Sequence, residues 1–168
     1  CASSIGALIT LGTFIDSKKI KEGLFITSSH NLTAEKQFRF PIEYGVPKPE
    51  RSTFTTTGCI GLSLSKKKSN IKLINGTIGN VIDSQVTDVY NMGAVMAPST
   101  VDTFLRHLEL TKTSPSDYDL ILTGDLGKVG ADIFIELLKE KNIKLKNYKD
   151  AGTIIYSNKE YSGASGPT

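Results

Sequence analysis

The chain has 168 residues, of which 39% are hydrophobic and 22% are charged, as in one soluble globular domain with a core of its own. Its net charge of +3, from 20 basic and 17 acidic residues, is too small and too dispersed to indicate a nucleic-acid partner. No apolar run approaches the roughly 18 residues that cross a bilayer, and Cys1 and Cys59 belong to no disulfide or zinc-binding motif. We therefore expect no nucleic acid, metal or cofactor, and a reducing compartment.

The first third of the chain predicts a helix, a strand and a loop. Small residues, with Ile5, Leu8 and Ile9 on one face, are typical of a tightly packed helix over residues 3–15. Residues 24–28 predict a short buried strand. Three prolines and mixed charges over residues 30–51 predict a long ordered loop, and loops of that length in compact domains usually serve function.

The middle of the chain predicts a hairpin and a helix. Residues 54–65 are rich in threonine and β-branched side chains, and residues 71–79 follow a lysine-rich turn, so the two segments are expected to pair antiparallel. A helix is predicted over residues 94–110, with Pro98 in its first turn. Its apolar side chains recur with a helical period, at Val101, Phe104, Leu105 and Leu108.

The last third predicts a strand, a helix and a strand. After a turn at residues 114–117, residues 118–123 read as a buried strand and residues 129–141 as a helix. Four side chains of that helix are expected to face inward: Ile133, Phe134, Leu137 and Leu138. Residues 153–156 predict a final strand. Strands and helices that alternate in this order indicate a mixed-sheet α/β domain.

Polar residues at the starts of the two later helices are candidate ligand contacts. Gly124-Asp125-Leu126-Gly127-Lys128 is a glycine-rich turn from strand to helix, whose N–H groups and Lys128 could bind an anion. A tight turn capped by Asp125 is the simpler alternative. Asn91 opens the helix before it, where it could contact a ligand or act only as an N-cap.

Three further residues could carry chemistry. Cys1 would be a nucleophile or a pocket-lining residue at a helix N-terminus, where the helix dipole lowers the thiol pKa. His30 could donate a hydrogen bond to a carboxylate or simply anchor its loop. Arg39 lies between two aromatic residues and could clamp a carboxylate, or pair with Glu35 or Glu43 to fix the loop.

Three separated segments resemble one family in the same order along the chain. The first is Thr27-Ser28-Ser29-His30, together with the polar residues that follow it as far as Gly45. The second runs from Thr87 to Pro98 and contains Asn91-Met92-Gly93. The third runs from Thr123 to Gly130. Together they resemble the stage V sporulation protein AD family, which are thiolase-fold proteins of spore-forming bacteria. The resemblance implies an α/β, thiolase-like fold: part of a five-layered αβαβα arrangement, with a mixed sheet and packed helices.

The resemblance also implies how the chain is organised. A thiolase fold needs two halves rich in βαβ units, and this chain matches the central to C-terminal part. Residues 1–168 are therefore expected to form a single thiolase-like region whose N-terminal half is missing. Because the chain starts at Cys1 without a methionine and ends in a glycine-rich stretch, we expect it to be a fragment or the product of a short gene.

The family implies that the protein binds dipicolinic acid, the pyridine dicarboxylate stored in spores. It would act in the spore uptake machinery with other stage V sporulation A membrane proteins, peripheral at the inner spore membrane, and a homodimer is left open. The sequence also predicts which residues would contact the ligand. They are Cys1, His30, Arg39, Asn91, Gly124, Asp125, Gly127 and Lys128.

The condensing chemistry of related enzymes is predicted to be lost. Ketoacyl synthases supply a histidine after the penultimate strand and an asparagine later, and this chain has Gly124 and Asp150 in those regions. His107 lies in a predicted helix and is expected at the surface. A non-catalytic binding protein is favoured, because an ionised carboxylate cannot stabilise an oxyanion. The alternative is an acyltransferase that uses Cys1 as its nucleophile.

Overall fold

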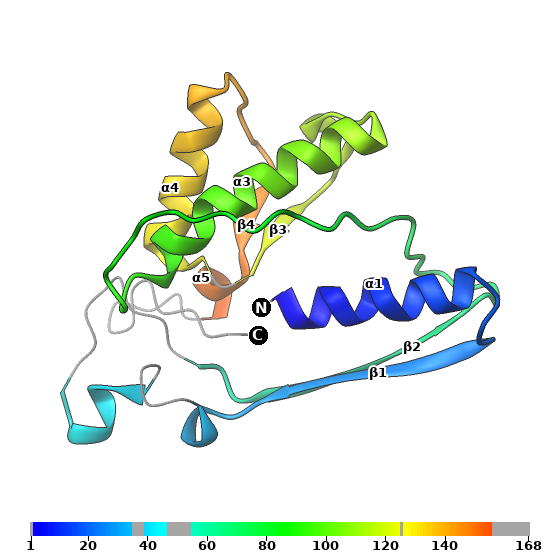
Figure 1. Ribbon diagram of the computed structural model, residues 1–168, viewed down its shortest axis with the longest axis horizontal. Helices are drawn as coiled ribbons and strands as arrows, with labels where there is room; N and C mark the ends of the chain where they lie inside the picture. The colour runs from blue at the N-terminus through cyan, green and yellow to red at the C-terminus, as the bar shows by residue number, and fades with distance from the viewer. Residues whose placement is uncertain (1, 35–38, 47–54, 125, 156–168) are drawn as a thin grey trace.

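Two groups of helices and strands, joined by an extended segment, make up the molecule (Figure 1). The computed structural model describes residues 2–34, 39–46, 55–124 and 126–155. The first group contains α1 (Ala2–Asp16), β1 (Glu22–Ser29) and β2 (Gly58–Ser65). The second contains α3 (Met92–Thr111), β3 (Ile121–Thr123), α4 (Gly127–Glu140), β4 (Tyr148–Asp150) and α5 (Ala151–Ile155). The α/β class is confirmed, and the arrangement is consistent with a thiolase-like fold.

In the first group, α1 covers one face of a two-stranded antiparallel ribbon. The register runs from Glu22 opposite Ser65 to Ser29 opposite Gly58. Phe25 points toward α1 and is 7% exposed, whereas its neighbours Leu24 and Ile26 are 66% and 62% exposed on the other face. Alternation along β1 thus places apolar side chains on both faces, and α1 covers only one of them.

The predicted hairpin between residues 54–65 and 71–79 is wrong. β2 pairs with β1 instead, because β1 offers eight residues in continuous register and the pairing places Phe25 beneath α1. Residues 71–87, here named the bridging segment, form neither a helix nor a paired strand. Of the predicted first strand, residues 58–65 are confirmed and residue 54 lies outside the described residues.

The bridging segment passes α1 and then α3 (Figure 1). It approaches α1 so closely that a Cβ built on Gly76 would lie 2.7 Å from Cγ1 of Ile9. Farther along, its Thr77 hydroxyl is 2.8 Å from Nδ1 of His107, and Nδ2 of Asn80 donates to Asp102 over 3.1 Å. Contacts to both helices therefore hold this segment without sheet hydrogen bonds.

In the second group, α3 and α4 cross at two glycines. A Cβ built on Gly93 would lie 2.8 Å from the backbone nitrogen of Gly130, so only hydrogen fits at the crossing. The approach buries a core beside it, and the Phe134 ring contacts that of Tyr148 at 5.2 Å between centroids. The buried core residues are Ala97, Val101, Leu126, Phe134 and Leu138, with Phe104, Leu105, Ile133 and Leu137 packed against them.

Helix α3 is confirmed, but it begins earlier than predicted. Its N-cap is Asn91, so Pro98 is the seventh helical residue and does not lie in the first turn as expected. Proline has no N–H to donate to the carbonyl of Ala94, and the helix continues past it. Among the described residues, no helix is both long enough and apolar enough to cross a bilayer.

Strand β3 is shorter than predicted, β4 was not predicted at all, and one predicted strand is a helix. Ile121 pairs with Tyr148, and Thr123 with Asp150. Residues 153–155 belong to α5, because the Asp150 side chain caps that helix by accepting from the backbone N–H of Thr153. The apolar pair Ile154-Ile155 had suggested a strand over residues 153–156. The last residue of that predicted strand, 156, lies outside the described residues.

The predicted loop over residues 30–51 contains two 3₁₀ turns in its described parts, Asn31–Thr33 and Ile42–Tyr44. Residues 35–38 and 47–51 lie outside the described residues. The predicted turn at residues 114–117 is confirmed as a 3₁₀ turn, Pro115–Asp117.

Candidate functional site

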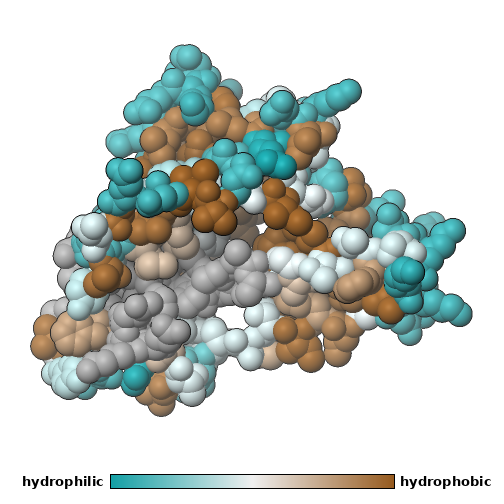
Figure 2. Space-filling model, in the orientation of Figure 1, coloured by the Kyte–Doolittle hydropathy of each residue, from teal (hydrophilic) through white to brown (hydrophobic). Residues whose placement is uncertain are grey.

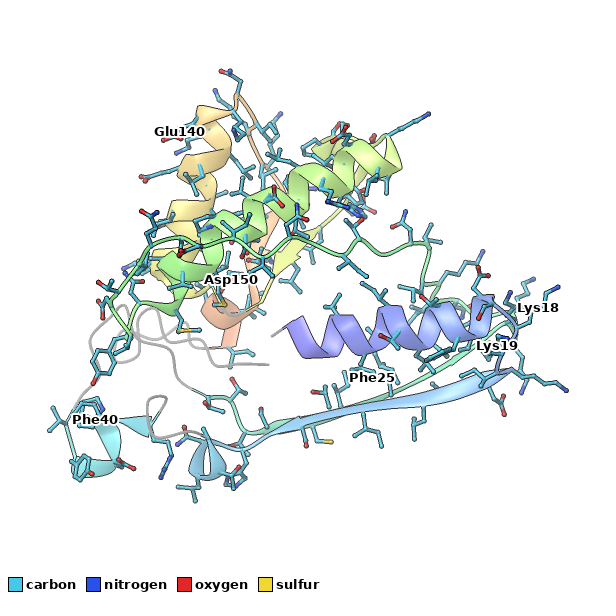
Figure 3. All side chains as sticks on the ribbon, in the orientation of Figure 1. Lys18, Lys19, Phe25, Phe40, Glu140 and Asp150 are labelled. Carbon is cyan, nitrogen blue, oxygen red and sulfur yellow. The ribbon has the colours of Figure 1, made fainter. Side chains whose placement is uncertain are left out.

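The strands β3 and β4 end side by side, at Thr123 and Asp150, and a helix begins shortly after each of them. The carboxyl ends of parallel strands are where open α/β sheets bind ligands, because the following turns and helix N-termini converge there. This edge is therefore the candidate site. Figure 3 shows Asp150 at this edge, below α3 and next to α5.

Asp150 is the central side chain of the edge and is only 2% exposed. Its Oδ1 accepts a hydrogen bond from the Thr123 hydroxyl over 2.8 Å. Its Oδ2 accepts from the backbone N–H groups of Gly127 and Thr153, over 3.1 Å and 3.2 Å. One carboxylate thus joins the end of β3 to the N-termini of both α4 and α5.

Burial raises the pKa of the Asp150 carboxyl above its ordinary value of 3.8. The hydrogen bonds from Thr123, Thr153 and Gly127 oppose that shift, because they stabilise the charged form. The positive ends of two helix dipoles also favour the anion. Burial therefore destabilises the ionised form of Asp150, while the surrounding hydrogen-bond donors and helix N-termini stabilise it.

Tyr148 extends this network to a second titratable group. Its hydroxyl lies 2.8 Å from Oγ1 of Thr123. Because Thr123 has one hydroxyl proton and donates it to the Asp150 carboxylate, Tyr148 is the donor to Thr123. Burial raises the pKa of Tyr148 to about 12, and the negative charges of Asp150 and Asp132 add to the shift.

The start of α4 depends on Gly127. This residue has φ of 63°, a left-handed conformation that strains residues with side chains. In that conformation its N–H donates to Asp150. The positive end of α4 is therefore already met by an internal anion, and a second anion at this edge would have to bind beside Asp150.

Three of the predicted ligand residues lie together in the turn at this edge. Gly127 is buried, whereas Gly124 and Lys128 are exposed on either side of it. Lys128 is exposed, and no hydrogen bond or ion pair joins it to another described residue. Cys1 and Asp125 lie outside the described residues.

The other three predicted residues have structural partners within their own segments. Nδ1 of His30 accepts from the Leu32 N–H over 3.2 Å and caps a 3₁₀ turn. The Arg39 guanidinium donates to the Ala34 carbonyl over 2.8 Å and pairs with Glu43 at 3.1 Å. Oδ1 of Asn91 accepts from the N–H of Ala94 over 3.1 Å at the start of α3. In each case the structure shows the simpler of the two sequence interpretations, and a ligand role remains a prediction.

His107 is not a surface residue as predicted. It is part-buried, with Nδ1 2.8 Å from Oγ1 of Thr77 and Nε2 3.1 Å from the Tyr118 hydroxyl. The prediction was wrong because the bridging segment covers this side of α3, and the sequence had placed that segment in a hairpin. His107 thereby fastens the bridging segment to the second group.

Sequence reasoning missed Thr123, Tyr148 and Thr153 as parts of the edge. The signal for the start of α5 was Asp150 itself, because aspartate is a favoured N-cap residue. The strand expected at residues 153–156 concealed it. Among the described residues, no cluster of three or more His, Cys, Asp or Glu side chains could hold a metal ion.

Comparison with known proteins gives one consistent result. The family model for stage V sporulation protein AD matches residues 1–168. The chain is also 38% identical, over 169 aligned positions, to the stage V sporulation protein AD of Bacillus subtilis (strain 168). That alignment covers 99% of this chain and 50% of the relative, so the chain spans half the length of that protein. The chain belongs to the stage V sporulation protein AD family.

Proposed function

We propose that this member of a sporulation family is a non-catalytic subunit that binds dipicolinic acid in the spore uptake machinery. Its partners would be the other stage V sporulation A membrane proteins, with the protein peripheral at the inner spore membrane. A thiolase-like region completed by a second half is part of the same proposal, since the chain spans half of its relative. The family match supports the sporulation role, and the geometry of the edge supports binding without catalysis.

The placement of the histidines carries the non-catalytic part of the proposal. The chain has two histidines; His30 caps a turn and His107 holds the bridging segment. At the carboxyl edge of β3 and β4, the chain instead places Gly124 and the buried Asp150. A developing oxyanion needs hydrogen-bond donors, and a carboxylate at that position would repel it. The described residues of this edge therefore include no histidine that could act as a base or as an oxyanion donor.

The exposed part of the turn is suited to a carboxylate ligand. Lys128 supplies an exposed cation in the first turn of α4, and Gly124 is also exposed to solvent. Beneath them, Asp150 fixes the backbone of Gly127, so it acts as a positioning residue and would not touch the ligand. Dipicolinate would place one carboxylate beside the Lys128 ammonium group, where a charge-assisted hydrogen bond can form.

Calorimetric titration of the complete protein tests this proposal. Dipicolinate is compared with isophthalate, which has the same pair of carboxylates on a ring without nitrogen. Lys128→Ala should weaken dipicolinate binding by about 1–3 kcal/mol, the range for a lost hydrogen bond to a charged group. Lys139→Ala removes an exposed lysine farther along α4 and should leave binding unchanged. Equal affinity of both variants and the parent would place the ligand elsewhere.

One observation favours a second candidate function. Helix α1 begins at Ala2, the residue after Cys1 in the sequence, and cysteines at helix N-termini are in general the more nucleophilic ones. An acyltransferase would use the Cys1 thiolate to accept an acyl group from a coenzyme A thioester. We expect no acyl transfer above background from the complete protein. Turnover that disappears in Cys1→Ala would replace the binding proposal with this one.

A further inference from the structure

One end of the molecule carries a larger positive charge than the net charge of the whole chain. The turn after α1 and the turn after β2 lie side by side there, because Glu22 pairs with Ser65 at the end of the ribbon. These two turns, residues 16–22 and 66–72, are here named the basic tip. They contain seven lysines and two carboxylates, a local charge of +5, whereas the whole chain has +3. Figure 2 shows this end as a hydrophilic cap, and Figure 3 places Lys18 and Lys19 on it.

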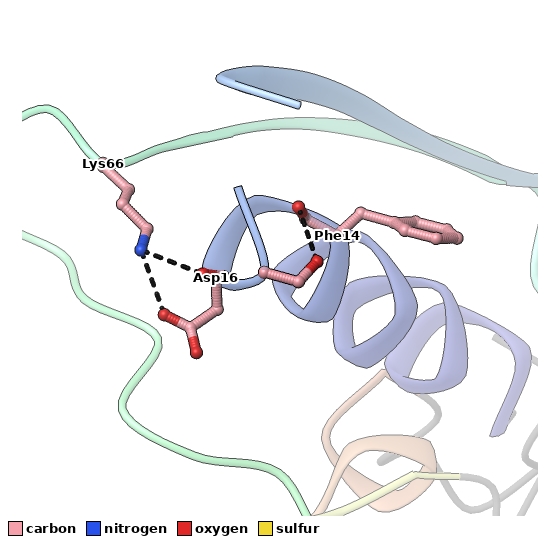
Figure 4. A network of polar contacts seen from close by, with 4 residues as sticks. Phe14, Asp16 and Lys66 are labelled. Atoms are coloured by element: carbon pink, nitrogen blue, oxygen red, sulfur yellow. Dashed lines mark hydrogen bonds and ion pairs between the residues drawn. The ribbon is translucent and has the colours of Figure 1, made fainter. Parts of the chain in front are cut away.

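Both carboxylates of the basic tip are already paired. Nζ of Lys66 lies 3.1 Å from Oδ1 of Asp16, as Figure 4 shows, and also donates to the Asp16 carbonyl. Nζ of Lys67 lies 3.0 Å from Oε2 of Glu22. The other five lysines are exposed and form no ion pair with a described carboxylate: Lys18, Lys19, Lys21, Lys68 and Lys72.

Exposed aliphatic side chains accompany these lysines. Ile71 is 88% exposed between Lys72 and the turn that carries Lys68, and Ile20 is 39% exposed within the first turn. The basic tip contains neither arginine nor an aromatic residue. Proteins usually bind nucleic acid through bidentate hydrogen bonds from arginine and through aromatic rings that stack on the bases. Lysines next to aliphatic residues suit a lipid surface, where charge attracts anionic headgroups and apolar side chains enter the interface.

We propose that the basic tip is a docking surface for an anionic lipid bilayer. The five unpaired lysines would lie at the headgroups, and Ile71 would enter the interfacial layer with Ile20 beside it. The inference deepens the peripheral membrane location in the proposed function, and its own support is the exposed lysines and isoleucines of the basic tip. Dipicolinate titration and vesicle binding can fail independently of each other, so the two proposals remain distinguishable.

Vesicle sedimentation of the complete protein tests the proposal. The protein should sediment with vesicles of equimolar phosphatidylglycerol and phosphatidylcholine, and not with phosphatidylcholine alone. Raising the salt from about 0.1 M to about 1 M should abolish binding, because the screening length falls from about 10 Å to about 3 Å. Binding to anionic vesicles that persists in high salt would contradict an electrostatic docking surface.

Two charge-matched variants locate the contact. Combining Lys19→Gln, Lys21→Gln, Lys68→Gln and Lys72→Gln should weaken vesicle binding about a thousandfold. Lys18 is left in place because its backbone is left-handed, with φ of 60°. The control combines four exposed positions of the second group, Lys139→Gln, Lys141→Gln, Lys144→Gln and Lys146→Gln, and should bind almost as the parent does. Equal losses in both variants would overturn the proposal.

A fluorescent reporter tests insertion and separates lipid from nucleic acid. The chain contains no tryptophan, so Ile71→Trp introduces a single indole into the basic tip. Its emission should shift to the blue with anionic vesicles, because the ring leaves water. A short DNA duplex should give no shift and should not displace the vesicles. A duplex that binds the tip more tightly than the vesicles would overturn the assignment to lipid.

Discussion

The two groups of the molecule are both rich in apolar residues, but they differ in what covers those residues. In the second group, α3 and α4 meet through Gly93 and Gly130, and Phe134 and Leu138 are fully buried between the helices and the strands. In the first group, α1 covers one face of the ribbon and leaves Leu24, at 66% exposure, on the other. Regular secondary structure therefore forms in both groups, whereas a closed core forms in one of them.

The comparison shows that hydrogen bonding and burial are separate requirements. The ribbon has eight residue pairs in register, so its backbone groups are well paired. Its outward side chains still face solvent, and backbone hydrogen bonds by themselves contribute little net stability. We expect the second group to supply most of the cooperative stability of the chain and the first group to open more readily.

The largest expected effect comes from deleting one aromatic ring in the second group. Phe134→Ala should lower the free energy of unfolding by about 3–5 kcal/mol, because it leaves a cavity in a closed core. The matched deletion in the first group, Leu24→Ala, removes an exposed side chain and should cost less than about 0.5 kcal/mol. Urea unfolding followed by circular dichroism measures both. Similar losses would show that the ribbon face is covered after all.

Glycine substitutions should have opposite signs in the two groups. Gly93→Ala would place a methyl group within 2.5 Å of the Leu126 carbonyl oxygen and should destabilise by about 1–3 kcal/mol. Gly6→Ala in α1 meets nothing within 4 Å and should stabilise by roughly 0.5–1 kcal/mol, because alanine is the better helix former. Thermal unfolding of the two variants provides the comparison. Destabilisation by Gly6→Ala would mean that α1 packs more tightly than described.

A pH-dependent effect should be confined to the second group. The folded-state pKa of Asp150 lies above its ordinary value of 3.8, so the folded protein holds that proton more tightly. Its stabilising contribution is full below pH 3.8 and is lost as the pH rises through the folded pKa. Asp150→Asn cannot ionise and should remove this dependence, with a change on the order of 1 kcal/mol at neutral pH.

Urea unfolding of parent and Asp150→Asn between about pH 4 and pH 7 checks the sign. The parent should lose stability relative to the variant as the pH rises. The opposite trend would mean that the donors around the carboxylate outweigh its burial.

The smallest expected effect is at the basic tip. Lys66→Gln breaks the ion pair with Asp16, whose side chain is 89% exposed. Exposed ion pairs are screened by water and salt, so the free energy of unfolding should fall by less than about 0.5 kcal/mol. Chemical denaturation at low salt measures it. A loss of several times that size would make the pair an essential link between α1 and β2.

Local patterns predicted the helices well. The 3.6-residue period located α3 and α4, including Val101, Phe134 and Leu138 as core residues, because an amphipathic helix displays its buried face in its sequence. Of the two parallel strands at the carboxyl edge, β3 was predicted within residues 118–123, whereas β4 was missed because residues 142–150 had been read as a link. Gly124, Gly127 and Lys128 came together there because one short turn contains all three.

Long-range pairing could not be predicted in the same way. Residues 71–79 look like a strand next to β2, and nothing local shows that β1, some forty residues earlier in the chain, takes that position. The same error concealed the partners of His107, which come from the bridging segment. The role of Asp150 was missed for a related reason, since its donors Thr123 and Gly127 are distant in sequence and meet only in the fold.

Hydrogen exchange of the complete protein, with and without dipicolinate, tests the central claim most directly. The account predicts that the ligand slows exchange of backbone amides in the turn at Gly124–Lys128 and at the start of α5, because binding fixes the edge that Asp150 organises. Amides of α1, β1 and β2 should exchange as before. Slower exchange confined to α1, β1 and β2, with the turn before α4 unaffected, would contradict the assignment of the site to the carboxyl edge of β3 and β4.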